Sequence, residues 1–134
     1  MRAIYLLLAL LAGCTTPGYT APLPILAPIR AVLGESEGEG FKGMLAVACT
    51  IRHRGNLKGV YGLRAFRVTH RLYSAHSLVL AEKAWAVSAH TDTVNGATGW
   101  GSASDIELFK HTSWWKHMRI VAHVGHHWFY RRVS

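Results

Sequence analysis

Acidic residues, cysteines and long apolar segments are all scarce in this chain, and each shortage narrows what it can do. Seven Asp and Glu residues stand against fifteen Lys and Arg in 134 residues, which gives a formal net charge of +8. A basic chain suits an anionic partner such as nucleic acid, an anionic membrane or an anionic cell wall. No RNA- or DNA-binding motif accompanies these charges, so nucleic acid is not an expected partner. Half of the residues are hydrophobic, which suffices for one compact domain and argues against a disordered tail protein.

A signal peptide is predicted at the N-terminus. The apolar run 4–11 follows the positively charged Arg2, has the length of a signal-peptide core and is too short for a permanent membrane-spanning helix. Leu11-Ala12-Gly13-Cys14 comes next and resembles the lipobox of bacterial lipoproteins, in which the cysteine becomes the lipid-modified first residue. We therefore expect a signal peptide over residues 1–13, a lipid anchor at Cys14 and an exported protein that faces the periplasm or cell wall from a membrane. An ordinary secretory signal with an incidental cysteine is the alternative.

Proline and cysteine usage divides the rest of the chain. All four prolines fall between Pro17 and Pro28, so residues 14–28 are predicted to form an extended tether, and residues 29–134 the domain. Cys49 is the second of two cysteines and lies in an apolar run, which predicts a buried thiol rather than a disulfide partner or a nucleophile.

Hydrophobic periodicity predicts mostly helices. Residues 41–54 carry apolar side chains at helical spacing, with Arg52 and Arg54 in the last turn and Gly55 as a stop. The other expected elements are a short helix over 29–33, a loop over 55–67, a helix over 77–89, turns over 91–104, and strands over 119–124 and 128–131. The fold class is therefore α+β, mostly helical with a small antiparallel sheet.

Three acidic residues crowd a glycine-rich stretch before the helix at 41–54. Glu35, Glu37 and Glu39 occupy every second position between Gly34 and Gly40, where we expect a turn. A carboxyl group held partly against an apolar wall can act as a general acid. The alternative is that these residues only complement the dipole at a helix N-terminus.

Three blocks of sequence together carry a more specific signal. The first follows the pattern G-E-[AS]-x-G-E and a helix ending in N-R, matched by Gly34, Glu35, Ser36, Gly38, Glu39, Gly43, Met44, Ala46, Val47, Ala48 and Arg54. The second is matched by Gly96, Ala97 and Thr98, with Trp100 where an aromatic residue is expected. The third is matched by Trp114, Val124, Gly125, His127, Phe129 and Tyr130. In this order the blocks resemble the cell-wall hydrolase family typified by the spore cortex-lytic enzyme SleB. The chain departs from the pattern at His53, Gly99 and His126, and residues 55–91 match poorly.

The resemblance implies a lysozyme-like domain that cleaves the glycan strands of peptidoglycan, as a monomer and without a cofactor. Glu35 would be the catalytic residue, and a single catalytic glutamate suits a lytic transglycosylase better than a hydrolase. The residues expected to contact substrate are Trp100, Trp114, His127 and Tyr130. Those expected to have structural roles are Glu39, Gly96, Ala97, Thr98, Gly125 and Phe129.

Two other functions stay open at this point. The departures from the pattern would suit a lipoprotein that binds peptidoglycan through a degenerate cleft without cleaving it. The histidines near the C-terminus would suit a zinc-dependent cell-wall amidase, namely His111, His117, His123, His126 and His127. The chain contains no H-E-x-x-H motif and no carboxylate after Glu107, so no metal site is expected.

Overall fold

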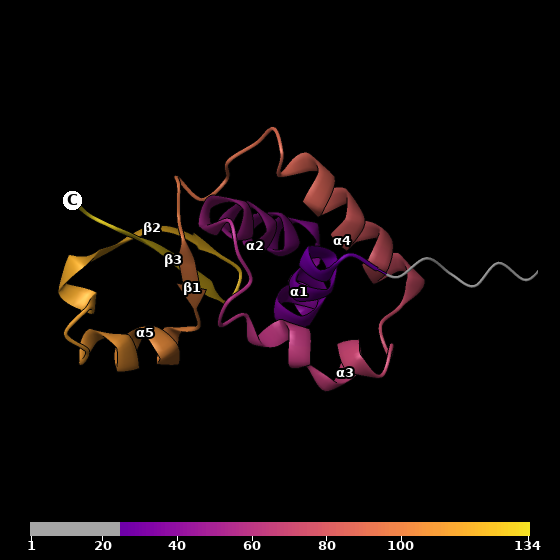
Figure 1. Cartoon of the computed structure of the whole chain (residues 1–134), viewed down its shortest axis with the longest axis horizontal. Coiled ribbons are helices and arrows are strands. Elements are labelled where there is room, and N and C mark those ends of the chain that lie inside the picture. Colours follow the sequence, from indigo (N-terminus) through magenta and orange to yellow (C-terminus); the bar gives the residue numbers. More distant parts are fainter. Residues whose placement is uncertain (1–24) are drawn as a thin grey trace, which may run out of the picture.

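The computed structural model describes residues 25–134. The helices are α1 (Ala27–Ser36), η1 (Glu37–Glu39), α2 (Gly40–Arg54), η2 (Tyr61–Arg64), α3 (Phe66–Thr69), α4 (Ala75–Val87), α5 (Ala103–Lys110) and η3 (Trp115–His117), where η marks a 3₁₀ helix. The strands are β1 (Gly99–Gly101), β2 (Met118–Val124) and β3 (His127–Arg132). Helices α1, α3 and α4 lie toward one end of the molecule and the small sheet lies toward the other, with α5 beside the sheet (Figure 1). The predicted α+β class, mostly helical with a small antiparallel sheet, is confirmed. The predicted signal peptide, Cys14 and most of the tether lie outside the described residues.

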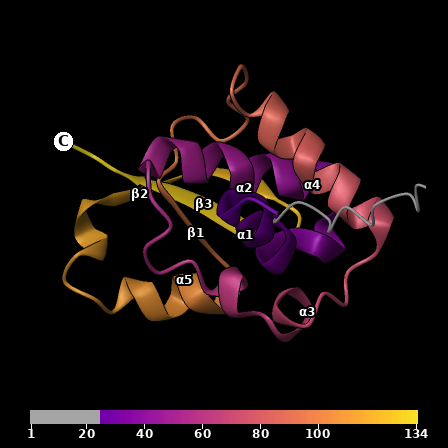
Figure 2. The ribbon, with the colours of Figure 1, turned by 45° about the vertical axis from the view of Figure 1, so that its right-hand side comes forward.

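Helix α2 is the centre of the fold. It begins one residue before the predicted start and ends at Arg54, and Gly55 follows it with a φ of 70° and donates its N–H to the carbonyl of Ile51 at 3.0 Å. The sequence pattern indicated one apolar face, but every residue from Gly43 to Ile51 is buried. This happens because α1 and α4 cover one side and the sheet covers another (Figures 1 and 2).

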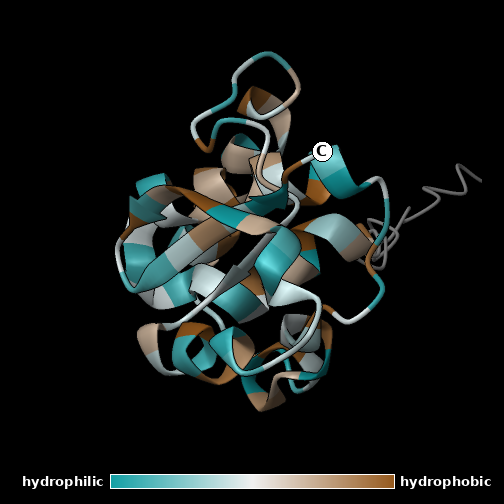
Figure 3. Cartoon of the chain, turned by 90° about the vertical axis from the view of Figure 1, so that its left-hand side faces the viewer, coloured by the Kyte–Doolittle hydropathy of each residue, from teal (hydrophilic) through white to brown (hydrophobic). Residues whose placement is uncertain are grey.

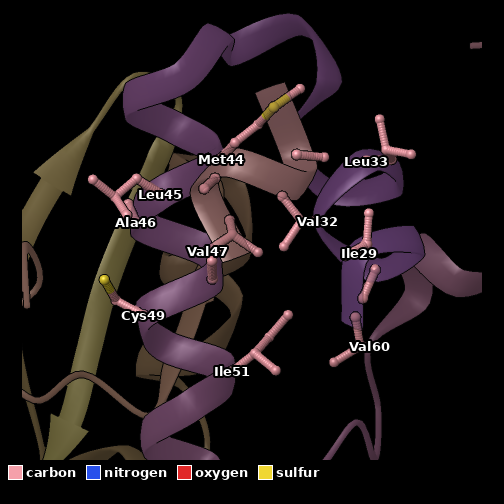
Figure 4. Close-up of a cluster of buried hydrophobic side chains, with 14 of the residues drawn as sticks. Ile29, Val32, Leu33, Met44, Leu45, Ala46, Val47, Cys49, Ile51 and Val60 are labelled. Carbon is pink, nitrogen blue, oxygen red and sulfur yellow. The ribbon is translucent and has the colours of Figure 1, made fainter. Parts of the chain in front are cut away.

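The core lies mainly between α1 and α2. Figure 4 shows Val47 and Ile51 on the side of α2 that faces Val32 and Ile29 of α1, whereas Cys49 points to the opposite side. Cys49 is fully buried, as predicted, and its thiol donates to the carbonyl oxygen of Thr91 at 3.2 Å. Filling this core is the main apolar contribution to folding.

Helix α1 extends further in both directions than predicted. It begins at Ala27, with Pro28 in its first turn. A proline is tolerated there because the N–H that it lacks would have no partner within the helix. The last two residues of the predicted tether therefore belong to the helix. It then runs through Gly34 and Glu35 to Ser36, whose hydroxyl donates to the Val32 carbonyl at 2.7 Å. The expectation of a turn at Glu35 was wrong, and this carboxylate sits on the last turn of a helix.

The middle of the chain is more helical than the sequence indicated. The predicted loop over 55–67 contains η2 and runs into α3, and the predicted helix over 77–89 is α4, shifted two residues toward the N-terminus. The hydroxyl of Ser74 accepts the N–H of Ser77 at 3.0 Å and starts α4 there. None of the helices within residues 25–134 has the length and apolar character that a membrane crossing requires. In Figure 3, most helices change between hydrophilic and hydrophobic residues along the ribbon, as helices lying on a core do.

The sheet is antiparallel with the strand order β1-β3-β2. The two predicted strands near the C-terminus are confirmed as β2 and β3, joined at Gly125, which has a φ of 58°. β1 was not predicted, since the sequence favoured turns over 91–104, and most of α5 lies in residues 105–118, for which no element was predicted. A turn does lie at Asn95 and Gly96, which both have positive φ, and β1 follows it as the outer partner of β3.

Candidate active site

Two N–H donors hold the carboxyl group of Glu35. The backbone N–H of Gly62 donates to Oε1 at 2.6 Å, and the indole N–H of Trp100 donates to Oε2 at 3.1 Å. Glu35 is half-buried, and its partners come from η2 and β1, which lie 27 and 65 residues further along the chain. The orientation of this carboxyl group is therefore fixed by tertiary structure.

Two glycines allow η2 to come this close to α1. A Cβ atom added to Gly34 would lie 1.9 Å from the carbonyl oxygen of Gly62, and one added to Gly62 would lie 2.7 Å from the Glu35 Cγ. Only residues without side chains permit the two backbones to touch. The glycine before Glu35 thus positions its hydrogen-bond donor.

Glu35 lines two hollows in the surface. One hollow, of about 360 Å³, extends toward the sheet and is lined by the rings of Trp100, Phe109 and Tyr130. The other, of about 630 Å³, extends toward α3 and includes Phe66. Because Glu35 lines both, a long ligand can pass its carboxyl group with one part in each hollow. We call the hollow toward the sheet the aromatic cleft.

The structure brings together residues from all three sequence blocks. Glu35 comes from the first block, Trp100 from the second, and His127 and Tyr130 from the third, and all four line the aromatic cleft. Trp114, the fourth residue expected to contact substrate, is not among the residues lining that cleft. Its ring packs beside two rings that do line the cleft, with centroids 5.2 Å from that of Phe109 and 6.0 Å from that of Tyr130.

The phenol of Tyr130 stays protonated. Burial raises the pKa of Tyr130 above its ordinary value, with a smaller lowering by the guanidinium of Arg54 and a smaller raising by the carboxylate of Asp105. A neutral hydroxyl in the cleft can both donate and accept a hydrogen bond.

Two charged cleft residues had no predicted role. Arg54 lines the aromatic cleft, with its guanidinium 5.7 Å from the centroid of the Trp100 ring. Asp105 also lines it, and its Oδ2 accepts the N–H of Ser102 at 2.9 Å and the Ser102 hydroxyl at 2.8 Å, in the capping box that starts α5. A serine followed three residues later by an acid is a sequence sign of a helix start, and it would have indicated α5.

Glu39 ties α2 to the β2–β3 turn. Its carboxylate accepts the backbone N–H of His126 at 3.1 Å and lies 2.6 Å from the His126 Nδ1. Burial would raise the pKa of Glu39, but the side-chain and backbone hydrogen bonds from His126 outweigh it and hold the pKa below its ordinary value. The carboxylate leaves no room for a Cβ at Gly125, where an added Cβ would lie 1.7 Å from Oε2. Its contact is thus with the hairpin, 87 residues away, rather than with the neighbouring turn.

The remaining motif residues do not line the aromatic cleft and make structural contacts. Ala97 and Phe129 are fully buried, the Ala97 carbonyl lies 2.9 Å from Nδ1 of His53, and the Thr98 N–H donates to the Tyr130 carbonyl at 2.9 Å. The N–H of Gly96 donates to a carboxylate oxygen of Asp92 at 2.8 Å. The Thr98 bond extends the pairing of β1 with β3, and the other two contacts hold the turn before β1. Glu37, which carried no predicted role, pairs with Arg67 at 3.0 Å.

The histidines do not form a metal centre within residues 25–134, since no three His, Cys, Asp or Glu side chains come together there in a way that could hold an ion. His126 is bound to Glu39, and the ring of His123 stacks on Trp128 with centroids 3.9 Å apart. His127 is the one that reaches the aromatic cleft, and its Nδ1 is buried without a hydrogen-bond partner among the described residues. This atom can hydrogen-bond to a ligand or to a water molecule in the cleft.

Comparison with known proteins gives the fold a name. No protein-family model and no curated protein matches the chain. Among solved structures, the catalytic domain of the germination-specific lytic transglycosylase SleB from Bacillus anthracis matches with a TM-score of 0.52 and 23% identity, over 84% of this chain and all of that one. The catalytic domain of the Bacillus cereus SleB protein matches with a TM-score of 0.50 and 21% identity, over 82% of this chain and 94% of that one. The fold is thus that of the SleB catalytic domain, as the three blocks predicted.

Proposed function

We propose that this protein cleaves the glycan strands of peptidoglycan, with Glu35 as its catalytic acid. The observation that carries the proposal is the position of Glu35, which lines two hollows and whose carboxyl group is oriented by two N–H donors. Such a site suits a polymeric substrate that binds along both hollows and runs past one catalytic carboxyl group. The shared fold with two SleB catalytic domains, one of them described as a lytic transglycosylase, supports this reaction class.

The chemistry needs only one carboxyl group if the sugar supplies the nucleophile. Glu35 donates its proton to the glycosidic oxygen as the bond from that oxygen to C1 of muramic acid breaks. The C6 hydroxyl of the same sugar then attacks C1, and the Glu35 carboxylate takes the hydroxyl proton. No water is consumed, and the product is an anhydro sugar. The proton returned to Glu35 prepares it for the next cycle.

The other cleft residues have roles that fit this reaction. The faces of Trp100 and Tyr130 offer stacking surfaces for sugar rings, which expose C–H groups on their faces. The neutral hydroxyl of Tyr130 and the unpartnered Nδ1 of His127 can bond to sugar hydroxyl or acetamido groups. These contacts would hold the scissile bond at Glu35.

The test is digestion of isolated peptidoglycan by the purified protein and its Glu35→Gln variant. We expect release of soluble saccharides by the wild type and a loss of about 10²–10⁴-fold in the variant, the usual contribution of general acid–base catalysis. Glu107→Gln is the matched control, because Glu107 is exposed, pairs with Lys110 and lines neither hollow. Equal activity of Glu35→Gln and wild type would refute the proposal, as would release of peptides in place of saccharides.

Asp105 supports a second candidate reaction, hydrolysis of the same bond. It places a second carboxyl group in the cleft with Glu35, and its Oδ1 makes no hydrogen bond to residues 25–134. Two carboxyl groups are what a glycoside hydrolase uses to activate water or form a covalent intermediate. Asp105→Asn keeps the acceptor that caps α5, so it should leave transglycosylation nearly intact but abolish hydrolysis. Product masses that are lower by one water identify transglycosylation.

We also propose that the protein is exported and acts as a monomer at a membrane surface, anchored by a lipid on Cys14. The lipobox-like sequence carries this proposal, and the basic charge would draw the domain to an anionic wall or anionic lipid. In a bacterial host, Cys14→Ser should move the protein from the membrane fraction to the soluble fraction. Unchanged fractionation would exclude the anchor.

A further inference from the structure

Arg54 brings a positive charge into the aromatic cleft from the C-terminal end of α2. It lies over Trp100 and is half-buried, and one guanidinium nitrogen, Nη2, donates to the carbonyl of Lys58. That bond fixes the guanidinium in place and leaves most of its five N–H donors unused. The end of a helix also attracts cations, but that attraction does not require Arg54 to line the cleft.

No carboxylate neutralises Arg54. All seven acidic residues of the chain lie within residues 25–134, and none of their oxygens comes within 4 Å of this guanidinium. The two carboxyl groups that share the cleft are bound elsewhere, Glu35 to Gly62 and Trp100, and Asp105 to Ser102.

Two nearby arginines each make two side-chain hydrogen bonds, whereas Arg54 makes one. Arg67 forms a salt bridge with Glu37 in the neighbouring hollow. Arg52, two residues before Arg54, donates to the Ser88 hydroxyl and the Trp85 carbonyl at 2.7 Å each and stacks on the Trp85 ring. Arg54 therefore differs from these two in lining the aromatic cleft and in making a single hydrogen bond, to a backbone carbonyl.

We propose that Arg54 binds a carboxylate carried by the glycan, so that the aromatic cleft selects an acidic sugar over a neutral one of the same size. A guanidinium forms two parallel hydrogen bonds with a carboxylate, which gives both affinity and orientation. This inference rests on the proposed function. In peptidoglycan, the acidic sugar is muramic acid, whose lactyl carboxylate is free only where no stem peptide is attached. The preferred substrate class is thus glycan strands from which the peptides have been removed.

This preference also places the reaction in a sequence. Stem peptides are attached to the lactyl group through an amide bond, so an amide-cleaving reaction must supply the preferred strands. The cleft itself then consumes them by cutting between sugars.

The test compares three soluble strands of equal length: peptide-free strands, the same strands with their lactyl carboxylates converted to methylamides, and strands that keep their stem peptides. Binding is measured by calorimetry in a Glu35→Gln background, so that no strand is consumed. We expect the peptide-free strands to bind about tenfold more tightly than the methylamides, which matches a hydrogen bond to a charged group. The Glu35→Gln/Arg54→Gln protein should bind both alike, and Arg54→Lys should restore part of the difference.

Lys58→Gln is the control for charge alone, since Lys58 lies in the same segment, is exposed and does not line the cleft. It should keep the tenfold ratio. Melting temperatures of all variants check that the loop after α2 remains folded.

Equal binding of free and methylamide strands by the protein that keeps Arg54 would overturn the inference, and so would a ratio that survives Arg54→Gln. Arg54-dependent binding that is tightest for peptide-bearing strands would also overturn it, because the carboxylate would then belong to the peptide. Cleavage of the same strands by wild type is scored separately, so a protein that binds selectively but does not cut would count against the proposed function alone.

Discussion

Replacing Gly34 by alanine should destabilise the protein, although local helix energetics predict the opposite. Gly34 lies inside α1, where alanine is favoured over glycine by about 1 kcal/mol. Its neighbour across the contact is the Gly62 carbonyl oxygen, which would lie 1.9 Å from the new methyl carbon. The sign of the effect therefore tests whether α1 and η2 touch as described.

The expected loss of stability follows from the movement that the substitution forces on η2. Ordinary van der Waals contact needs about 3.4 Å, so η2 would have to withdraw by about 1.5 Å from α1. That movement breaks the 2.6 Å hydrogen bond from Gly62 to Glu35. Overpacking costs about 1–3 kcal/mol and a lost hydrogen bond to a charged group about 1.5–3 kcal/mol. After subtracting the helix preference of about 1 kcal/mol, we expect a net loss of about 3 kcal/mol, within a range of about 1.5–5 kcal/mol.

Thermal unfolding followed by circular dichroism measures this loss as a fall of about 10 °C or more in the midpoint. Gly38→Ala is the matched control from the same stretch, because a Cβ there meets nothing within 4 Å. It should change the stability by less than about 0.5 kcal/mol. A Gly34→Ala protein as stable as wild type, or more stable, would refute the close approach and with it the account of how Glu35 is oriented.

Two further variants test the contacts around the site. Trp100→Phe keeps an aromatic ring but removes the indole N–H from Glu35, and it should lower kcat on peptidoglycan by about tenfold or more while leaving the melting temperature within a few degrees. Unchanged kcat would show that this hydrogen bond does not matter to catalysis. Glu39→Gln should cost about 1–2 kcal/mol at pH 7, because the carboxylate that binds His126 is replaced by a neutral amide. The pKa of Glu39 is lowered in the folded protein, so its stabilisation is present above the ordinary value of 4.5 and fades as pH falls through the folded-state pKa. Urea titrations of variant and wild type should therefore converge in strong acid, and a constant difference down to pH 2 would contradict this origin.

The sequence was most informative where local and long-range signals agree. α2 was predicted within one residue because its apolar spacing, basic last turn and Gly55 all point to the same helix. The three blocks named four residues of the aromatic cleft, Glu35, Trp100, His127 and Tyr130, from distant segments that only the fold brings together. Periodicity alone could not have joined Trp100 to Glu35.

The errors have physical causes. β1 consists of Gly-Trp-Gly, which has no alternation of its own and is a strand only because it pairs with β3. The glycine before Glu35 was interpreted as a turn residue, whereas its role is to admit a neighbouring backbone. Arg54 and Asp105 lacked predicted roles because their roles depend on which charged groups lie near them in the folded cleft, and the sequence does not give these neighbours.

In the proposed reaction Glu35 acts alone as acid and base while the sugar supplies its own nucleophile. Digestion of peptidoglycan in ¹⁸O-labelled water, followed by mass analysis of the fragments, distinguishes this reaction from hydrolysis. We expect fragments that lack one water and carry no ¹⁸O, released by wild type and by Asp105→Asn but not by Glu35→Gln. Fragments with ¹⁸O at a reducing end that disappear in Asp105→Asn would contradict it and make the protein a two-carboxylate hydrolase.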